Sequence, residues 1–197
     1  MIAYRRVKQV VLATEDPTDR KVRFMALLNS SMPKGGRRPV LTGGSAIEVY
    51  LDGILRTGDM DIVYPSASLE LALRAWHFSR EHGLRSCLNE ELGLSVDMVG
   101  EDLSGSYDLV TTITTDFGPA VIIGVEDLIL KRLASAKFWK VPSDMEQAYL
   151  LAKAHEGDSD WGYLEAEARK QDLTDYLNRL KGMVGSPSKG NRTRSAR

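Results

Sequence analysis

The segment from residue 40 to residue 63 constrains the fold most, because its apolar period changes twice. Val40-Leu41-Thr42 is a short apolar run that ends at two glycines, which is typical of a strand. The apolar residues that follow have the i, i+3, i+4, i+7 spacing of a one-sided helix: Ile47, Tyr50, Leu51 and Ile54. Acidic and apolar residues then alternate from residue 59 until Pro65. The segment therefore predicts a strand, a helix and a second strand.

Two carboxylates, Asp59 and Asp61, are expected on one face of the second strand. Side chains at i and i+2 of a strand point the same way and lie roughly 7 Å apart at Cα. Carboxylate oxygens are preferred by cations of the magnesium type, which keep other positions for water and substrate phosphates. The pair is therefore a candidate site for one or two divalent ions. An Asp-x-Asp pair alone is also common on solvated strands and turns.

The start of the predicted helix is suited to an anion. Gly43 and Gly44 carry no Cβ, so a phosphate can approach the backbone closely. Ser45 follows them at the beginning of the helix, where free N–H groups and the helix dipole favour negative charge. A Gly-Gly-Ser sequence alone is more often a turn. Together with the two aspartates, it predicts a triphosphate site beside a metal site.

These motifs resemble a known superfamily. Gly43-Gly44-Ser45, followed by the sequence Arg-Thr-Gly-Asp-Met-Asp-Ile at residues 56–62, is similar to the signature of DNA polymerase β-like nucleotidyltransferases. Within that superfamily, the Gly-Gly-Ser-Ala helix start and the Arg-Thr-x-Asp-x-Asp form are most similar to AbiEii-type nucleotidyltransferases, which are toxins of bacterial toxin–antitoxin pairs. By motif order, the resemblance covers residues from about 38 to 156.

The resemblance implies a mixed α/β (α+β) fold, in which helices flank the sheet and a C-terminal helical bundle follows it. It implies Mg²⁺ or Mn²⁺ as the cofactor, bound by the catalytic carboxylates Asp59, Asp61 and Asp97. The residues that it assigns to the nucleotide are Gly43, Gly44, Ser45, Arg56, Thr57 and Lys131.

Asp97 also stands out from its own surroundings. Leu94, Val96 and Met98 alternate with more polar positions, which predicts a strand that contains a lone acid. A buried carboxylate without a partner is unfavourable, so a charge partner is expected. If this strand lies beside the Asp59 strand, a shared metal ion is that partner, and the resemblance makes Asp97 the third carboxylate, which can help to deprotonate the acceptor. The alternative is a strand-end aspartate that faces water.

A helix from about residue 126 to 137 resembles the one that follows the catalytic strands in this superfamily, and Lys131 matches its lysine. The chain departs from the superfamily downstream, where Ser143 stands before Asp144 in place of a basic residue and Gln147 stands in place of a second aspartate. The departure puts nucleotide choice and the role of Asp144 in doubt. Lysines on a helix also often form nothing more than a solvated face.

The remaining sequence predicts four parts: an N-terminal helical support (1–38), a nucleotidyltransferase core (39–124), a C-terminal helical part (125–181) and a disordered basic tail (182–197). Asp16-Pro17 begins a helix in the first part. The loop at 32–39 is basic and is either a phosphate contact or a solvated turn. In the core, a helix is expected from residue 66 to about residue 82, and residues 107–115 and 119–123 predict a hairpin. Helices are expected at 145–155, 161–170 and 173–180 in the third part.

Composition adds limits. The chain has 197 residues, of which 43% are apolar, enough for one sizeable core or a core with a helical appendage. The net charge of −1 gives no global field for nucleic acid. Cys87 is the only cysteine, which excludes an intramolecular disulfide and a zinc site built from cysteines. No membrane span or secretory leader is visible in the sequence, so a cytoplasmic location without membrane contact is expected.

The expected function is transfer of a nucleoside monophosphate from an NTP to an acceptor hydroxyl, with release of pyrophosphate. The acceptor is left open between tRNA, a protein hydroxyl and a small molecule such as an antibiotic, and a cognate antitoxin is a further possible partner. The alternative function is a non-catalytic nucleotide-sensing or partner-binding module on the same fold. The presence of all three carboxylates favours the enzyme.

Overall fold

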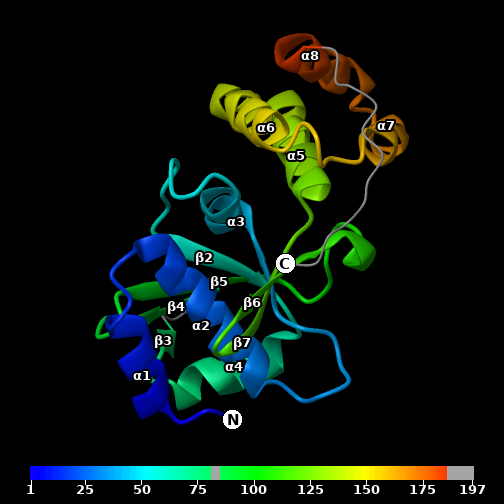
Figure 1. Ribbon diagram of the computed structural model, residues 1–197. Helices are drawn as coiled ribbons and strands as arrows, with labels where there is room; N and C mark the ends of the chain where they lie inside the picture. Colours follow the sequence, from blue (N-terminus) through cyan, green and yellow to red (C-terminus); the bar gives the residue numbers. More distant parts are fainter. Residues whose placement is uncertain (81–84, 186–197) are drawn as a thin grey trace. The chain divides into compact units, whose positions relative to one another are not determined.

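A computed structural model describes residues 1–80 and 85–185 (Figure 1). The chain divides into two compact units, residues 1–123 (unit 1) and residues 124–197 (unit 2), which are described separately. Among the described helices, none combines the length and the apolar character that crossing a membrane requires.

Unit 1 is built on a seven-stranded mixed sheet in the order β3-β4-β5-β2-β1-β7-β6. The strands are β1 (Val40–Thr42), β2 (Asp59–Val63), β3 (Ser79–Arg80), β4 (Ser86–Asn89), β5 (Leu94–Gly100), β6 (Thr111–Thr115) and β7 (Gly118–Ile122). At the centre, β2 runs antiparallel to β1 and parallel to β5. The predicted hairpin is confirmed for β6 and β7, which pair antiparallel.

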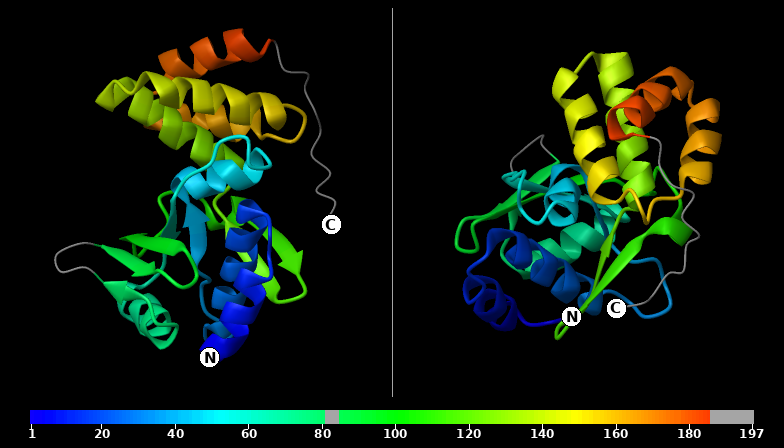
Figure 2. Two further views of the ribbon diagram at one scale, coloured as in Figure 1. Left: turned by 90° about the vertical axis from the view of Figure 1, so that its left-hand side faces the viewer. Right: turned by 45° about the horizontal axis from the view of Figure 1, so that its top comes forward.

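The described residues of unit 1 form four α-helices: α1 (Tyr4–Leu12), α2 (Pro17–Ser31), α3 (Gly43–Tyr50) and α4 (Ser66–Ala75). Helix α2 begins as predicted, because the Asp16 carboxylate accepts hydrogen bonds from the backbone N–H groups of Thr18 and Asp19. Its apolar side is buried, and it contacts β7, beside which it lies in both views of Figure 2. The predicted strand–helix–strand segment is confirmed as β1, α3 and β2.

Three details of unit 1 differ from the sequence predictions. Helix α4 ends at Ala75, because the chain turns at His77 (φ 59°) into β3. Residue 82, near which the helix was predicted to end, lies outside the described residues. Ile54 is 74% exposed, because α3 ends at Tyr50 and Asp52 then adopts a positive φ. Residues 107–109 form a 3₁₀ turn (η1), which Ser106 caps through its hydroxyl, and not the first part of a strand.

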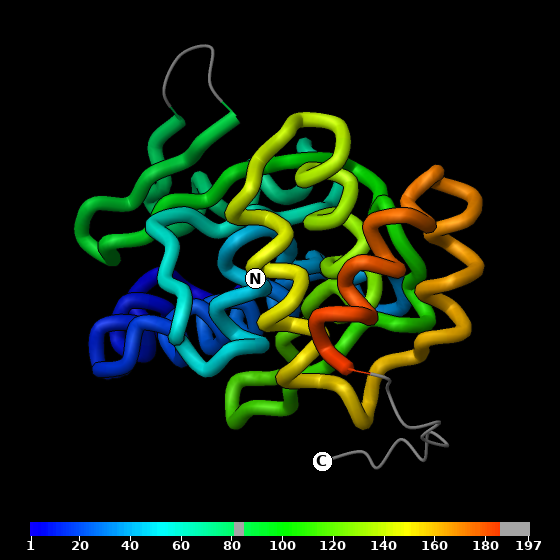
Figure 3. Tube along the Cα trace, turned by 90° about the horizontal axis from the view of Figure 1, so that it is seen from above, coloured from blue at the N-terminus to red at the C-terminus, as the bar shows by residue number. Residues whose placement is uncertain are grey.

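Unit 2 contains α5 (Val125–Ala134), a π-helical turn η2 (Ser135–Trp139), α6 (Pro142–Ala154), α7 (Trp161–Lys170) and α8 (Thr174–Val184). Helix α5 packs on α6 and α7, and α8 packs on the same two helices. In the Cα trace of Figure 3, α8 therefore lies between α6 and α7. Helix α8 includes residue 182, where the sequence predicted the beginning of a tail; residues 186–197 lie outside the described part of the chain.

Candidate active site

The three predicted carboxylates lie on two adjacent strands of unit 1. Asp61 on β2 is the register partner of Asp97 on the parallel strand β5, and Asp59 pairs with Ser95. All three aspartates are half-buried, whereas their neighbours along each strand are buried. Because register partners in a parallel pair project from the same side, Asp59, Asp61 and Asp97 share one face of the sheet.

Gly43 lies directly against this face. It has a positive φ of 63°, and a Cβ built on it would overlap the Asp61 carboxylate and lie 2.9 Å from the Asp61 Cβ. A Cβ on Gly44 would lie 3.3 Å from the side chain of Thr57, tighter than ordinary packing. The first glycine is therefore required both by its backbone conformation and by the close approach of the Asp61 side chain.

The first turn of α3 is fixed to β2 by Ser45. The Ser45 side chain is buried, and its hydroxyl donates a hydrogen bond to the backbone carbonyl oxygen of Asp59. This contact gives the hydroxyl a positioning role and leaves the backbone N–H of Ser45 as the candidate for the predicted phosphate contact. Within the described residues, the side chain of Thr42, the residue before the helix, does not cap the first turn. The N-terminal N–H groups of α3 thus offer an anion site next to the carboxylates.

The turn before β2 contains two further residues predicted for the site, Arg56 and Thr57. The Thr57 hydroxyl donates to Asp59 Oδ1 at 2.7 Å, so Thr57 orients a carboxylate as well as contacting Gly44. Arg56 is 62% exposed at its side chain, and its Nη2 lies 4.0 Å from Asp16 Oδ2. An exposed pair at this distance is weak, so the Arg56 guanidinium retains the freedom to bind a phosphate.

Beneath this turn lies a buried ion pair that the sequence analysis missed. Lys21 Nζ on α2 lies 2.6 Å from Glu48 Oε2 on α3, and the two side chains are 6% and 1% exposed. Burial alone raises the pKa of Glu48, but hydrogen bonds from Lys21, the Thr57 N–H and Thr18 together lower that pKa below its ordinary value. The sequence holds one signal for it, since Glu48 lies three residues before Leu51, on the apolar side of the predicted helix.

The donor set suits a hard divalent cation, because it consists of carboxylate oxygens on one face of neighbouring strands. Within residues 1–80 and 85–185, however, no group of three or more His, Cys, Asp and Glu side chains is gathered closely enough to hold a metal ion. Asp61 is turned against Gly43, and Asp59 is bonded to Thr57. The strands therefore place the three carboxylates on a common face, while Asp59 and Asp61 contact their own neighbours.

Lys131 and Asp144 lie in unit 2. Burial lowers the pKa of Lys131, an effect that Asp127 opposes and Arg132 reinforces. Asp144 is buried in the first turn of α6 and pairs with Arg132, whose Nη1 lies 3.3 Å from Asp144 Oδ1. The contacts of Asp144 are thus made within its own helical unit.

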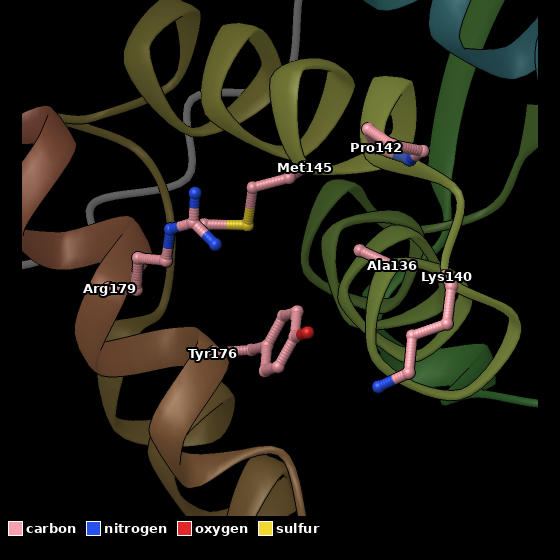
Figure 4. Close-up of a pocket in the computed structure, with 6 residues that line it drawn as sticks. All are labelled: Ala136, Lys140, Pro142, Met145, Tyr176 and Arg179. Atoms are coloured by element: carbon pink, nitrogen blue, oxygen red, sulfur yellow. The ribbon is translucent and has the colours of Figure 1, made fainter.

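Unit 2 also contains a cavity of about 240 Å³, lined by Ala136, Lys140, Pro142, Met145, Tyr176 and Arg179 (Figure 4). It contains none of the residues predicted for the site.

No family model matches the chain, and no curated protein matches its sequence. Among solved structures, the chain is similar to the antibiotic-resistance factor ANT(2'')-Ia, whose solution structure is described as revealing substrate-regulated conformation dynamics. The match has a TM-score of 0.50 and 14% sequence identity, and it covers 83% of this chain and 100% of that chain. A likeness at this identity concerns the fold. The predicted fold class is confirmed: the chain has a mixed α/β, nucleotidyltransferase-like fold.

Proposed function

We propose that this chain is a metal-dependent nucleotidyltransferase that transfers a nucleoside monophosphate from an NTP to an acceptor hydroxyl. The acceptor oxygen forms a bond to the α-phosphorus, the bond between that phosphorus and the bridging oxygen breaks, and pyrophosphate leaves. The acceptor proton passes to a carboxylate, for which Asp97 is the candidate.

Asp59 and Asp61, with Asp97 beside them in register, would hold Mg²⁺ or Mn²⁺. A divalent cation bound there supplies positive charge for the phosphate oxygens as they become more negative in the transition state. The uncapped first turn of α3, beginning at Gly43 and Gly44, offers N–H groups to the triphosphate. Arg56 and Lys131 are candidates for additional positive charge, and Thr57 contributes by orienting Asp59.

One observation carries the proposal: the Asp61 carboxylate fills the space that any side chain at residue 43 would need. This close approach supports a single site made of the helix start and the carboxylate face, both of which a triphosphate with its cation would need. The fold likeness to ANT(2'')-Ia, a nucleotidyltransferase, supports the same reaction class.

The test is transfer of label from each of four α-labelled NTPs with Mg²⁺ or Mn²⁺. The acceptor mixtures are total tRNA, cell protein and aminoglycoside antibiotics, and wild type is compared with the Asp59→Asn/Asp61→Asn variant. Label on one acceptor class, together with stoichiometric pyrophosphate, supports the proposal and names the acceptor. A variant that transfers label as well as wild type would contradict it.

Aminoglycosides belong in this test because the structural neighbour is an antibiotic-resistance factor. Transfer to tRNA or protein would instead favour the AbiEii-type function and justify a search for a cognate antitoxin. The alternative of a non-catalytic nucleotide-sensing module has one observation in its favour, since the described carboxylates are not gathered into a metal-binding cluster. Metal-dependent NTP binding that never yields pyrophosphate would establish that alternative.

A further inference from the structure

The buried ion pair of unit 1 contacts both polar groups of one backbone residue. The N–H of Thr57 donates to Glu48 Oε2 at 3.1 Å, and the carbonyl oxygen of Thr57 accepts from Lys21 Nζ at 2.6 Å. The second carboxylate oxygen of Glu48 accepts from the Thr18 hydroxyl at 2.9 Å. Both charged side chains thus end on the turn that precedes β2.

Stability alone gives little reason for such a pair. Removing two charges from water carries a desolvation penalty that their attraction repays only with good geometry, and apolar replacements of similar volume are often equally stable. A buried pair is therefore weak support for a purely stabilising role. Its contacts indicate a geometric role, because they hold both the N–H and the carbonyl oxygen of Thr57 in place.

The side chain of Thr57 connects this turn to the candidate site. From the fixed backbone of Thr57, the hydroxyl reaches Asp59 Oδ1 at 2.7 Å. The same side chain lies against Gly44, at the anion-binding start of α3. One residue thus connects the ion pair to a carboxylate and to the glycine turn.

We propose that Lys21 and Glu48 are positioning residues that act through Thr57 to orient Asp59 for a divalent cation. This inference rests on the proposed function, and it adds to the site two residues that do not touch substrate. It accounts for the presence of a buried lysine and a buried glutamate beneath a turn that lies outside the central sheet.

The test uses the full chain and the Lys21→Met/Glu48→Met variant, in which both charges are replaced together. We expect a melting temperature close to that of wild type and Mn²⁺ affinity, measured by electron paramagnetic resonance, about tenfold lower, the usual scale for loss of a group that orients a metal ligand. In turnover assays, we expect kcat to fall while the KM for NTP changes little. The Thr57→Val variant, which leaves the pair intact, should show the same loss of Mn²⁺ affinity.

The matched control is Lys8→Met/Glu91→Met, which removes an ion pair of unit 1 whose side chains are 42% and 49% exposed. It should leave Mn²⁺ affinity unchanged. The proposal is overturned if the Lys21/Glu48 variant binds Mn²⁺ as wild type does while Asp59→Asn does not. Wild-type protein that binds no Mn²⁺ would overturn the proposed function itself, and the positioning role with it, so the two failures are distinguishable.

Discussion

The two units use buried acidic residues in different ways. In unit 1, Glu48 is buried and accepts a hydrogen bond from the backbone N–H of Thr57. The hydroxyl of Thr57 in turn donates to Asp59 in the candidate site. In unit 2, the buried acids Glu126 and Asp127 connect helices to one another. Glu126 accepts from the backbone N–H of Asp160 at 2.8 Å, and Asp127 accepts from the Tyr163 hydroxyl at 2.7 Å.

This difference shows that burial of a charge does not by itself indicate chemistry. By its place in the sequence, Asp144 resembles part of the downstream nucleotidyltransferase element, yet its partner Arg132 lies on α5, an earlier helix of the same unit. Burial and the bond to Asp127 raise the pKa of Tyr163, so its phenol stays protonated and acts as a donor. We therefore expect removal of the buried Lys21–Glu48 charges in unit 1 to affect activity, and loss of the contacts of the buried acids in unit 2 to affect stability.

The largest effect is expected for Asp61→Asn. If Asp61 binds the cation as proposed, its loss removes several kcal/mol of transition-state stabilisation, which corresponds to at least about 100-fold in kcat/KM. Label transfer measures the loss, and thermal melting checks that the fold persists. Asp102→Asn, which alters an exposed partner of Arg37, is the control. Equal losses of kcat/KM in Asp61→Asn and Asp102→Asn would contradict a specific role for Asp61 in the active site.

Gly43→Ala is expected to rank second. Alanine disfavours the φ of 63°, and its Cβ would displace the Asp61 carboxylate. We expect a destabilisation of about 1–3 kcal/mol from the strained backbone and a reduction of activity that exceeds what partial unfolding explains. Gly58→Ala is a control in the same motif, because a Cβ at residue 58 meets no atom within 4 Å. If the two variants are equally active, the close approach of Gly43 and Asp61 has no functional meaning.

In unit 2, Tyr163→Phe removes the hydrogen bond to buried Asp127 without changing the ring. The unfolding free energy should fall by about 1.5–3 kcal/mol, the usual contribution of a hydrogen bond to a charged group. Denaturant titration measures this change, and Mn²⁺ binding should be unaltered. A loss of Mn²⁺ affinity with intact folding would contradict the division of roles between the units.

The smallest effect is expected in the acid dependence of stability. The folded-state pKa of Glu48 lies below its ordinary value of 4.5, so the stability that Glu48 contributes is present above that value and is lost as the pH falls through the folded pKa. Unfolding free energies of wild type should therefore decline more steeply below about pH 4.5 than those of Lys21→Met/Glu48→Met. If the unfolding free energies of the two proteins depend on pH in the same way, Glu48 is not ionised in the folded protein.

Local patterns predicted much of the fold. The alternation around Asp59 and Asp97 defined β2 and β5, and the two glycines marked the start of α3. The register between Asp61 and Asp97 could not be predicted, because parallel pairing joins distant segments through backbone contacts that side-chain period does not encode. The same holds for Lys21 and Glu48, since each is an ordinary surface residue type until tertiary packing buries both.

The apolar pattern of the sequence did not predict where helix α4 ends. The apolar residues Trp76 and Phe78 fit a continuing helix, yet both are buried after the helix has ended, with His77 turning the chain between them. The predicted site residues of unit 1 lie on β2, on β5, on the turn before β2 and at the start of α3, whereas Lys131 belongs to unit 2. Lys131 falls within residues 125–181, which the sequence predicted to be a C-terminal helical part separate from the core.

The most direct test of the central claim is anomalous diffraction from crystals that contain Mn²⁺ and a non-hydrolysable NTP analogue. The account predicts manganese coordinated by Asp59 and Asp61, with the triphosphate at the first turn of α3. Manganese bound elsewhere, or an analogue bound without contact to Asp59, Asp61 or Gly43, would contradict it.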